Sequence, residues 1–116
     1  MVKRSGELQV KVNENMRGGD GSVRMDAILT PEEMHNKGRV YSKLSVSPSG
    51  SIGYHVHENE MEAFYVLKGE GEFDDNGEKV RFRPGDVLYT PSGSGHSVKN
   101  LSADEDLEII ALILSK

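Results

Sequence analysis

Apolar and polar residues alternate along most of the chain, in short stretches separated by glycine. Val23, Met25, Ala27 and Leu29 alternate with other residues, which predicts a half-buried strand over 22–29. The pattern returns after residue 39 and predicts further strands. Their ranges are 40–46, 52–57, 63–67, 72–73, 79–82, 87–90, 97–101 and 107–114. Eight or nine short strands at this spacing favour an all-β sandwich or barrel.

Turn and loop signals lie between these ranges. Asn76-Gly77 predicts a type I′ hairpin between two of the strands, because both of its central residues accept a positive φ. Residues 13–21 contain three glycines among polar neighbours and are predicted to form a loop.

One segment carries a helix signal. Thr30 is a suitable N-cap, Pro31 suits the first helical position, and Glu33 completes a capping box. Gly38 follows soon after, so we expect a helix of about two turns before the next strand.

The last predicted strand is apolar on both faces. Leu107, Ile109, Ala111 and Ile113 lie on one face, and the other carries Ile110, Leu112 and Leu114. One interpretation is a central strand covered by the helix or by a loop, and the other is a subunit interface. We expect a homodimer.

Composition narrows the classes of function. A chain of 116 residues suits one domain, 1–116, with residues 1–21 partly in a loop and a barrel over about 39–115. There is no cysteine, which excludes thiolate ligands and disulfides. The formal charge of -5 disfavours a nucleic-acid partner. No apolar stretch is long enough for a membrane span or a signal peptide, so we expect cytoplasmic residence.

The candidate chemistry lies in His55, His57, Glu62 and His96. Side chains at i and i+2 of a strand share a face, so His55 and His57 can converge on one point. Three imidazoles and a carboxylate suit Mn, Fe, Co, Ni, Cu or Zn better than Ca or Mg. Taken singly, each histidine is more often a surface or core residue than a ligand. His35 lies in the predicted helix and is expected to be a solvated residue.

The spacing of these residues resembles the paired motifs of the cupin family. The match is His55-x-His57-x4-Glu62-x6-Gly69, then Gly85-x5-Pro91-x-Gly93-x2-His96-x3-Asn100. The motifs cover 49–100, and Ser49 departs from them where the family usually has glycine. The resemblance implies a double-stranded β-helix, or jelly-roll barrel, in which the four residues bind one divalent metal. We expect manganese first, with Fe, Ni, Zn, Co or Cu as alternatives.

The resemblance also directs attention to the pocket beside the metal. Strand alternation suggests that Gly53, Phe64, Val66 and Val98 line a small, largely apolar pocket. Similar cupins that decarboxylate oxalate carry an arginine where this chain has Ile52. The substitution counts against oxalate chemistry unless another cation, such as Lys43 or Arg39, reaches the pocket.

Three functions remain open at this point. The first is a metal-dependent enzyme, a dioxygenase, decarboxylase or isomerase, that acts on a small oxygen-rich substrate such as a carboxylate, diol or enediolate. The second is a metal-dependent module that binds or senses a small molecule without turnover. The third is a purely structural barrel. No catalytic acid or base stands out, although Glu58 and Glu60 are possible lid carboxylates.

Overall fold

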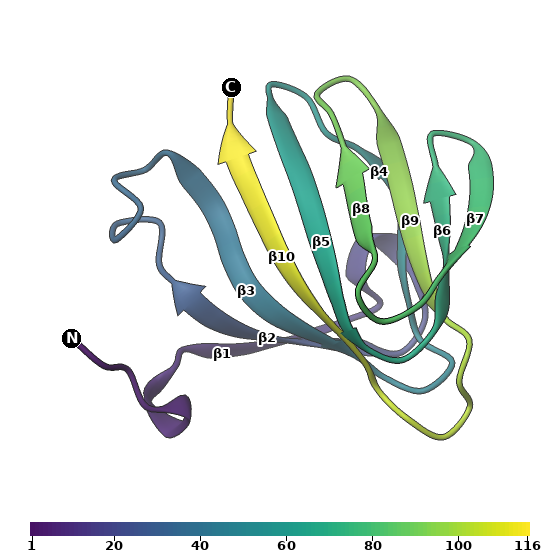
Figure 1. Ribbon diagram of the computed structural model, residues 1–116, viewed down its shortest axis with the longest axis horizontal. Helices are drawn as coiled ribbons and strands as arrows, with labels where there is room; N and C mark the ends of the chain where they lie inside the picture. Colours follow the sequence, from purple (N-terminus) through teal and green to yellow (C-terminus); the bar gives the residue numbers. More distant parts are fainter.

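The computed structural model describes residues 1–116 and consists almost entirely of β-strands (Figure 1). Two short 3-10 turns, η1 (Ser5–Glu7) and η2 (Met16–Gly18), flank the first strand. The strands are β1 (Val10–Glu14), β2 (Ser22–Leu29), β3 (Gly38–Val46), β4 (Ser51–Val56), β5 (Glu60–Lys68), β6 (Gly71–Asp75), β7 (Glu78–Phe82), β8 (Val87–Thr90), β9 (Gly95–Asn100) and β10 (Leu107–Ser115).

The strands form two antiparallel sheets that face each other. One has the order β1-β2-β3-β10-β5-β8 and the other β4-β9-β6-β7. From β3 onward, successive strands alternate between the sheets except at the β6–β7 hairpin. This alternation gives the double-stranded β-helix that the family resemblance implied.

The core lies between the two sheets. It is built from the inward-facing residues of both, because side chains alternate between the faces of a strand. The buried cluster consists of Val23, Leu44, Val46, Ile52, Phe64, Val66, Phe73, Phe82, Leu88, Val98, Leu107, Ile109 and Ala111. Asn100 is also buried, and its side-chain amide donates to the carbonyl oxygens of Val46, Ser47 and Glu105.

The local pattern located most strands well. β2 and β10 lie close to the predicted ranges, and Asn76 and Gly77 both have positive φ in the β6–β7 turn. The strand β1 was missed, although Val10 and Val12 alternate there with polar residues.

The predicted helix after Thr30 is wrong. The capping box forms, with Thr30 N–H donating to Glu33 and Glu33 N–H donating to Thr30 Oγ1. The chain then makes only turns, because His35 and Asn36 take left-handed backbone conformations (φ 55° and 58°) that end any right-handed helix. A segment this short gains too few hydrogen bonds to offset helix nucleation.

The strand β10 lies at the centre of its sheet, between β3 and β5. Its inner residues are buried, whereas Ile110 and Leu112 on the outer face are half-buried and Leu114 is exposed. The chain has no α-helix to cover this outer face. No helix of the chain is long and apolar enough to cross a membrane.

Candidate metal centre

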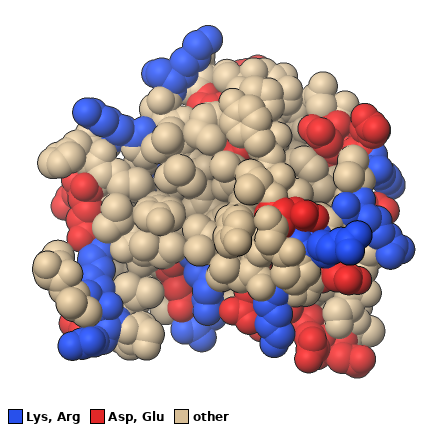
Figure 2. All heavy atoms as spheres, viewed as in Figure 1, with Lys and Arg blue, Asp and Glu red and all other residues tan.

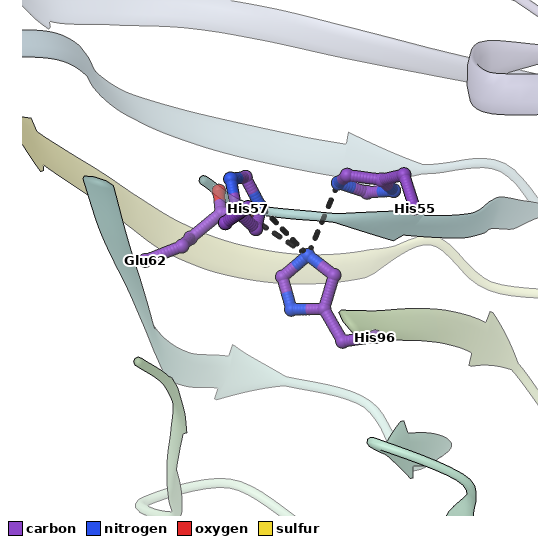
Figure 3. A group of neighbouring side chains, drawn as sticks. All are labelled: His55, His57, Glu62 and His96. Carbon is purple, nitrogen blue, oxygen red and sulfur yellow. Dashed lines mark hydrogen bonds and ion pairs between the residues drawn. The ribbon is translucent and has the colours of Figure 1, made fainter. Parts of the chain in front are cut away.

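Two neighbouring strands and one strand of the opposite sheet bring the four predicted ligands together (Figure 3). His55 on β4 lies directly opposite His96 on β9. His57 follows β4 by one residue, and Glu62 projects from β5 across the space between the sheets. Three of the four side chains are buried, and His55 is half-buried.

The donor atoms of these side chains converge on one point. His96 Nε2 lies 3.1 Å from His57 Nε2 and 3.2 Å from His55 Nε2. Glu62 Oε1 lies 2.8 Å from His57 Nε2 and 3.0 Å from His96 Nε2. All four donor atoms are within 4.8 Å of one another.

Each histidine is held by a partner on its other ring nitrogen. His55 Nδ1 donates to the carbonyl oxygen of Gly53 at 2.8 Å, and His57 Nδ1 lies 3.0 Å from Glu60 Oε1. His96 Nδ1 lies 2.7 Å from Thr90 Oγ1. Such partners fix the orientation of metal-binding imidazoles, and here they turn all three Nε2 atoms toward the same point.

The electrostatics of the site favour an ionised Glu62 beside His57. Hydrogen bonding to Glu62, aided by Glu60, raises the pKa of His57 above its usual value. Burial lowers the pKa of His55. Burial also acts to raise the pKa of Glu62, but hydrogen bonds with His57 and His96 outweigh it and leave that pKa below its usual value. Glu62 is therefore ionised at neutral pH and available as a ligand.

A cavity of about 220 Å³ adjoins three of the four side chains, those of His55, His57 and Glu62. A water molecule occupies about 30 Å³ in the liquid, so the cavity has room for a small molecule. Half of its lining is apolar, and Glu62 is its only carboxylate. The lining residues are Lys11, Asn13, Met16, Arg17, Met25, Arg39, Val40, Leu44, Ile52, His55, His57, Glu62, Phe64 and Ile113.

The residues expected in the pocket are divided between the cavity and its surroundings. Phe64 lines the cavity and stacks on His96, with ring centroids 5.3 Å apart. Val66 and Val98 are buried in the core instead. Gly53 lies outside the lining and contributes its carbonyl oxygen to His55.

Positive charge at the cavity exceeds what the sequence suggested. Of the two cations considered, Arg39 lines the cavity and Lys43 does not. Arg39 forms a two-pronged ion pair with Glu60 at 3.0 Å. Lys11 and Arg17, from the N-terminal segment, were not anticipated. No sequence signal marks them, because they lie about 40 residues from the first histidine motif.

The donor set suits a metal ion. Two ligands at right angles on an ion with bonds of about 2.1 Å are about 3.0 Å apart, and the close donor pairs here are separated by 2.8–3.2 Å. The three oriented imidazoles and the ionised carboxylate form a borderline-hard nitrogen and oxygen set, as expected for a first-row transition metal.

Comparisons with known proteins agree with this architecture. The oxalate-binding protein of Thermotoga maritima is 46% identical over 114 residues, which cover 98% of this chain and 93% of that protein. A crystal structure of a predicted oxalate decarboxylase from Thermotoga maritima superposes with a TM-score of 0.93 at 45% identity, and the match covers 100% of both chains.

More distant structures share the fold alone. The polyketide cyclase RemF of Streptomyces resistomycificus gives a TM-score of 0.73 at 20% identity, covering 99% of this chain and 80% of that one.

The model of the cupin domain matches residues 42–113, which include all four converging side chains. The chain therefore belongs to the cupin family.

Proposed function

We propose that His55, His57, Glu62 and His96 hold one divalent transition-metal ion, and that this ion binds a small oxygen-rich anion in the adjoining cavity. The observation that carries the proposal is the orientation of the imidazoles. Every Nδ1 has a partner of its own, which leaves three Nε2 atoms and Glu62 facing one point. Without a metal, this arrangement would crowd four polar groups together.

Manganese is our first expectation for the ion. Four protein ligands would leave two positions open on a six-coordinate ion, which would suit Mn, Fe, Co or Ni. A tetrahedral zinc site with bonds of about 2.1 Å would place its ligands about 3.4 Å apart. The closest donor pairs, including 2.8 Å between His57 and Glu62, are shorter than this. A tetrahedral zinc site is therefore less favoured.

A short carboxylate is the ligand that fits the cavity best. The bound ion would supply a Lewis acid for carboxylate oxygens. Arg39, Arg17 and Lys11 add positive charge to the lining, while Ile52, Phe64 and other apolar side chains restrict its size. The related Thermotoga maritima protein is named for binding oxalate, which supports the same class of ligand for this chain.

Binding without turnover is the activity that the lining supports best. Glu62, a proposed metal ligand, is the only carboxylate in the lining and is not free to carry protons. Glu60 is paired with Arg39, and this hydrogen bond chiefly lowers the pKa of Glu60 to about 2. A carboxylate this acidic is a poor proton donor at neutral pH.

Catalysis is the second candidate. The observation in its favour is the open side of the donor set, because a closed structural site would leave no position for a substrate. The reaction would be an oxygenation, decarboxylation or isomerisation of a small acid or diol, and Lys11 would be the remaining proton carrier in the lining.

Metal analysis and calorimetry test the proposal together. The purified protein should contain close to one transition-metal ion per chain, and the manganese-loaded protein should bind oxalate while the metal-free protein does not. The variant His96→Ala should lose both metal binding and oxalate binding, whereas His35→Ala, at an exposed turn, should keep both. Release of CO2 or consumption of oxygen by the loaded protein would favour catalysis over simple binding.

We also propose that the chain forms a homodimer through the outer face of the β10–β5–β8 region. Tyr65 lies between Ile110 and Val87 on this face, and Tyr89 lies at its edge. The exposed fractions of Tyr65, Val87 and Tyr89 are 48%, 64% and 54%. Figure 2 shows that charged side chains gather mainly around the margins of this view and leave its middle largely uncharged.

Light scattering at micromolar concentration tests the dimer. The expected mass is twice the chain mass of 12.8 kDa. The double substitution Val87→Lys and Tyr89→Lys should yield a monomer, since charge would have to be buried in the interface. The matched control Val80→Lys changes an exposed valine on β7, outside this face, and should leave the dimer intact. A monomeric wild-type mass would contradict the proposal.

A further inference from the structure

Two of the three cations that line the cavity have no carboxylate partner. Arg39 is neutralised by Glu60, but no ion pair involves Lys11 or Arg17. The chain as a whole carries a net charge of -5, so the unpaired cations beside the cavity are opposite in sign to the charge of the chain. Such charge is suited to an anion that enters the cavity.

The backbone around Arg17 is held in an unfavourable conformation. Arg17 has φ 55° and Asn15 has φ 52°, both in the left-handed region that costs free energy for residues with a Cβ atom. Hydrogen bonds lock the turn η2, because Gly18 N–H donates to Asn15 O and the Asn15 side chain donates to Gly19 O. Backbone strain of this kind persists where the surroundings hold it, and it is common at functional sites.

The turn η2 is packed backbone to backbone against β4, the strand that carries His55 (Figure 1). A Cβ atom added at Gly53 would lie 2.0 Å from the carbonyl oxygen of Arg17. One added at Gly19 would lie 2.3 Å from the carbonyl oxygen of Ser51. Only glycine fits at these two positions, so the contact depends on them and fixes where Arg17 stands.

Arg17 lies on the His55 side of the cavity. Its charge is among the minor influences that lower the pKa of His55, after burial. Arg39 stands near Glu60 and Glu62, toward the other side. The apolar Ile52 also lines the cavity and offers no charge.

We propose that Arg17, assisted by Lys11, binds the outward oxygens of an anion held at the metal, so that the cavity selects dianions over monoanions of the same shape. This inference rests on the proposed metal and anion site and specifies its ligand class. An arginine fork is suited to two carboxylate oxygens, and Arg17 lines the cavity although the residue as a whole is exposed to solvent.

The test compares oxalate with oxamate, which replaces one carboxylate of oxalate by an uncharged amide of nearly the same shape. Calorimetry of the manganese-loaded protein measures both affinities, and manganese paramagnetic resonance measures metal retention independently. For Arg17→Gln we expect a loss of about tenfold in oxalate affinity, with less than about threefold for oxamate and unchanged metal binding. Arg17→Lys should recover part of the oxalate affinity because it keeps the charge.

One further variant separates the charge of Arg17 from its placement, and another serves as a control. Gly19→Ala keeps Arg17 but must displace η2 from β4, and it should lower oxalate affinity in the same direction without loss of metal. Arg81→Gln removes an exposed arginine of β7, outside the cavity lining, and should change nothing.

The outcomes distinguish this inference from the proposed function. If the wild-type protein retains manganese but binds neither anion, the proposed function fails. If it binds oxalate and Arg17→Gln binds both anions as the wild type does, only the present inference is overturned. Equal losses for oxalate and oxamate, or loss of manganese from Arg17→Gln, would likewise contradict selection of dianions by Arg17.

Discussion

Thr90 Oγ1 lies 2.7 Å from Nδ1 of His96, and both side chains are fully enclosed by the barrel. The hydroxyl has no other hydrogen-bond partner in the chain, and Thr90 lies opposite Glu62 in the β5–β8 pairing. The threonine therefore links two of the proposed ligands: it orients one through its side chain and lies beside the other in the sheet.

The substitution Thr90→Val should weaken metal binding with little change of shape. Loss of the hydroxyl leaves His96 Nδ1 without its partner, and removal of such an orienting group typically costs about 10–100-fold in metal affinity. Titration with manganese followed by paramagnetic resonance measures the effect. Thr90→Ser keeps a hydroxyl and should retain most of the affinity, and equal affinities for Thr90→Val and the wild type would contradict an orienting role.

Metal affinity should fall as the solution becomes more acidic. The imidazoles bind metal only when neutral, and the raised pKa of His57 means that protons compete for this ligand first. Below that pKa, the manganese dissociation constant should rise by about tenfold per pH unit for each proton displaced. Manganese binding measured between pH 8 and pH 5.5 checks this, and a flat profile would contradict ligation by His57.

The ion pair between Arg39 and Glu60 should stabilise the fold in a pH-dependent way. Its hydrogen bond is the main reason that the pKa of Glu60 falls from 4.5 to about 2. Because the folded pKa is the lower one, the stabilisation is present above pH 4.5 and is lost as the pH falls through about 2. Glu60→Gln should thus cost on the order of 1 kcal/mol at pH 7 and less under acid conditions.

Urea unfolding of the metal-free protein at pH 7, 4 and 3 measures this difference. Glu78→Gln is the matched control, since Glu78 is exposed and forms no ion pair. A destabilisation by Glu60→Gln that stayed constant from pH 7 to pH 3 would show that the loss comes from packing and not from the ionised carboxylate.

Asn100 is expected to be a strong determinant of stability. Its buried amide donates to three carbonyl oxygens, and its own oxygen accepts from the backbone of Ser102. Asn100→Ala would leave these groups without partners, at a cost of about 3 kcal/mol. Thermal unfolding measures the loss, and a melting temperature equal to that of the wild type would contradict this account.

The sequence by itself determined most of the strands, though not β1, and the proposed ligand set. Alternation of apolar residues is a local property, so β2 could be located from Val23 to Leu29 without knowledge of its neighbours. The histidine spacing is also local, because His55 and His57 share one face of a single strand. The family resemblance then linked them to Glu62 and His96, which the structure brings within reach.

Only the tertiary structure decided whether a helix follows the capping box at Thr30 and which residues line the cavity. Thr30 and Glu33 form their hydrogen bonds, yet the turn ends at His35 because the chain must reverse into β3. Arg17 reaches the cavity through a backbone contact with Gly53, a residue 36 positions away in the sequence. Contacts between distant segments depend on how the whole barrel packs, and no local pattern of residues encodes them.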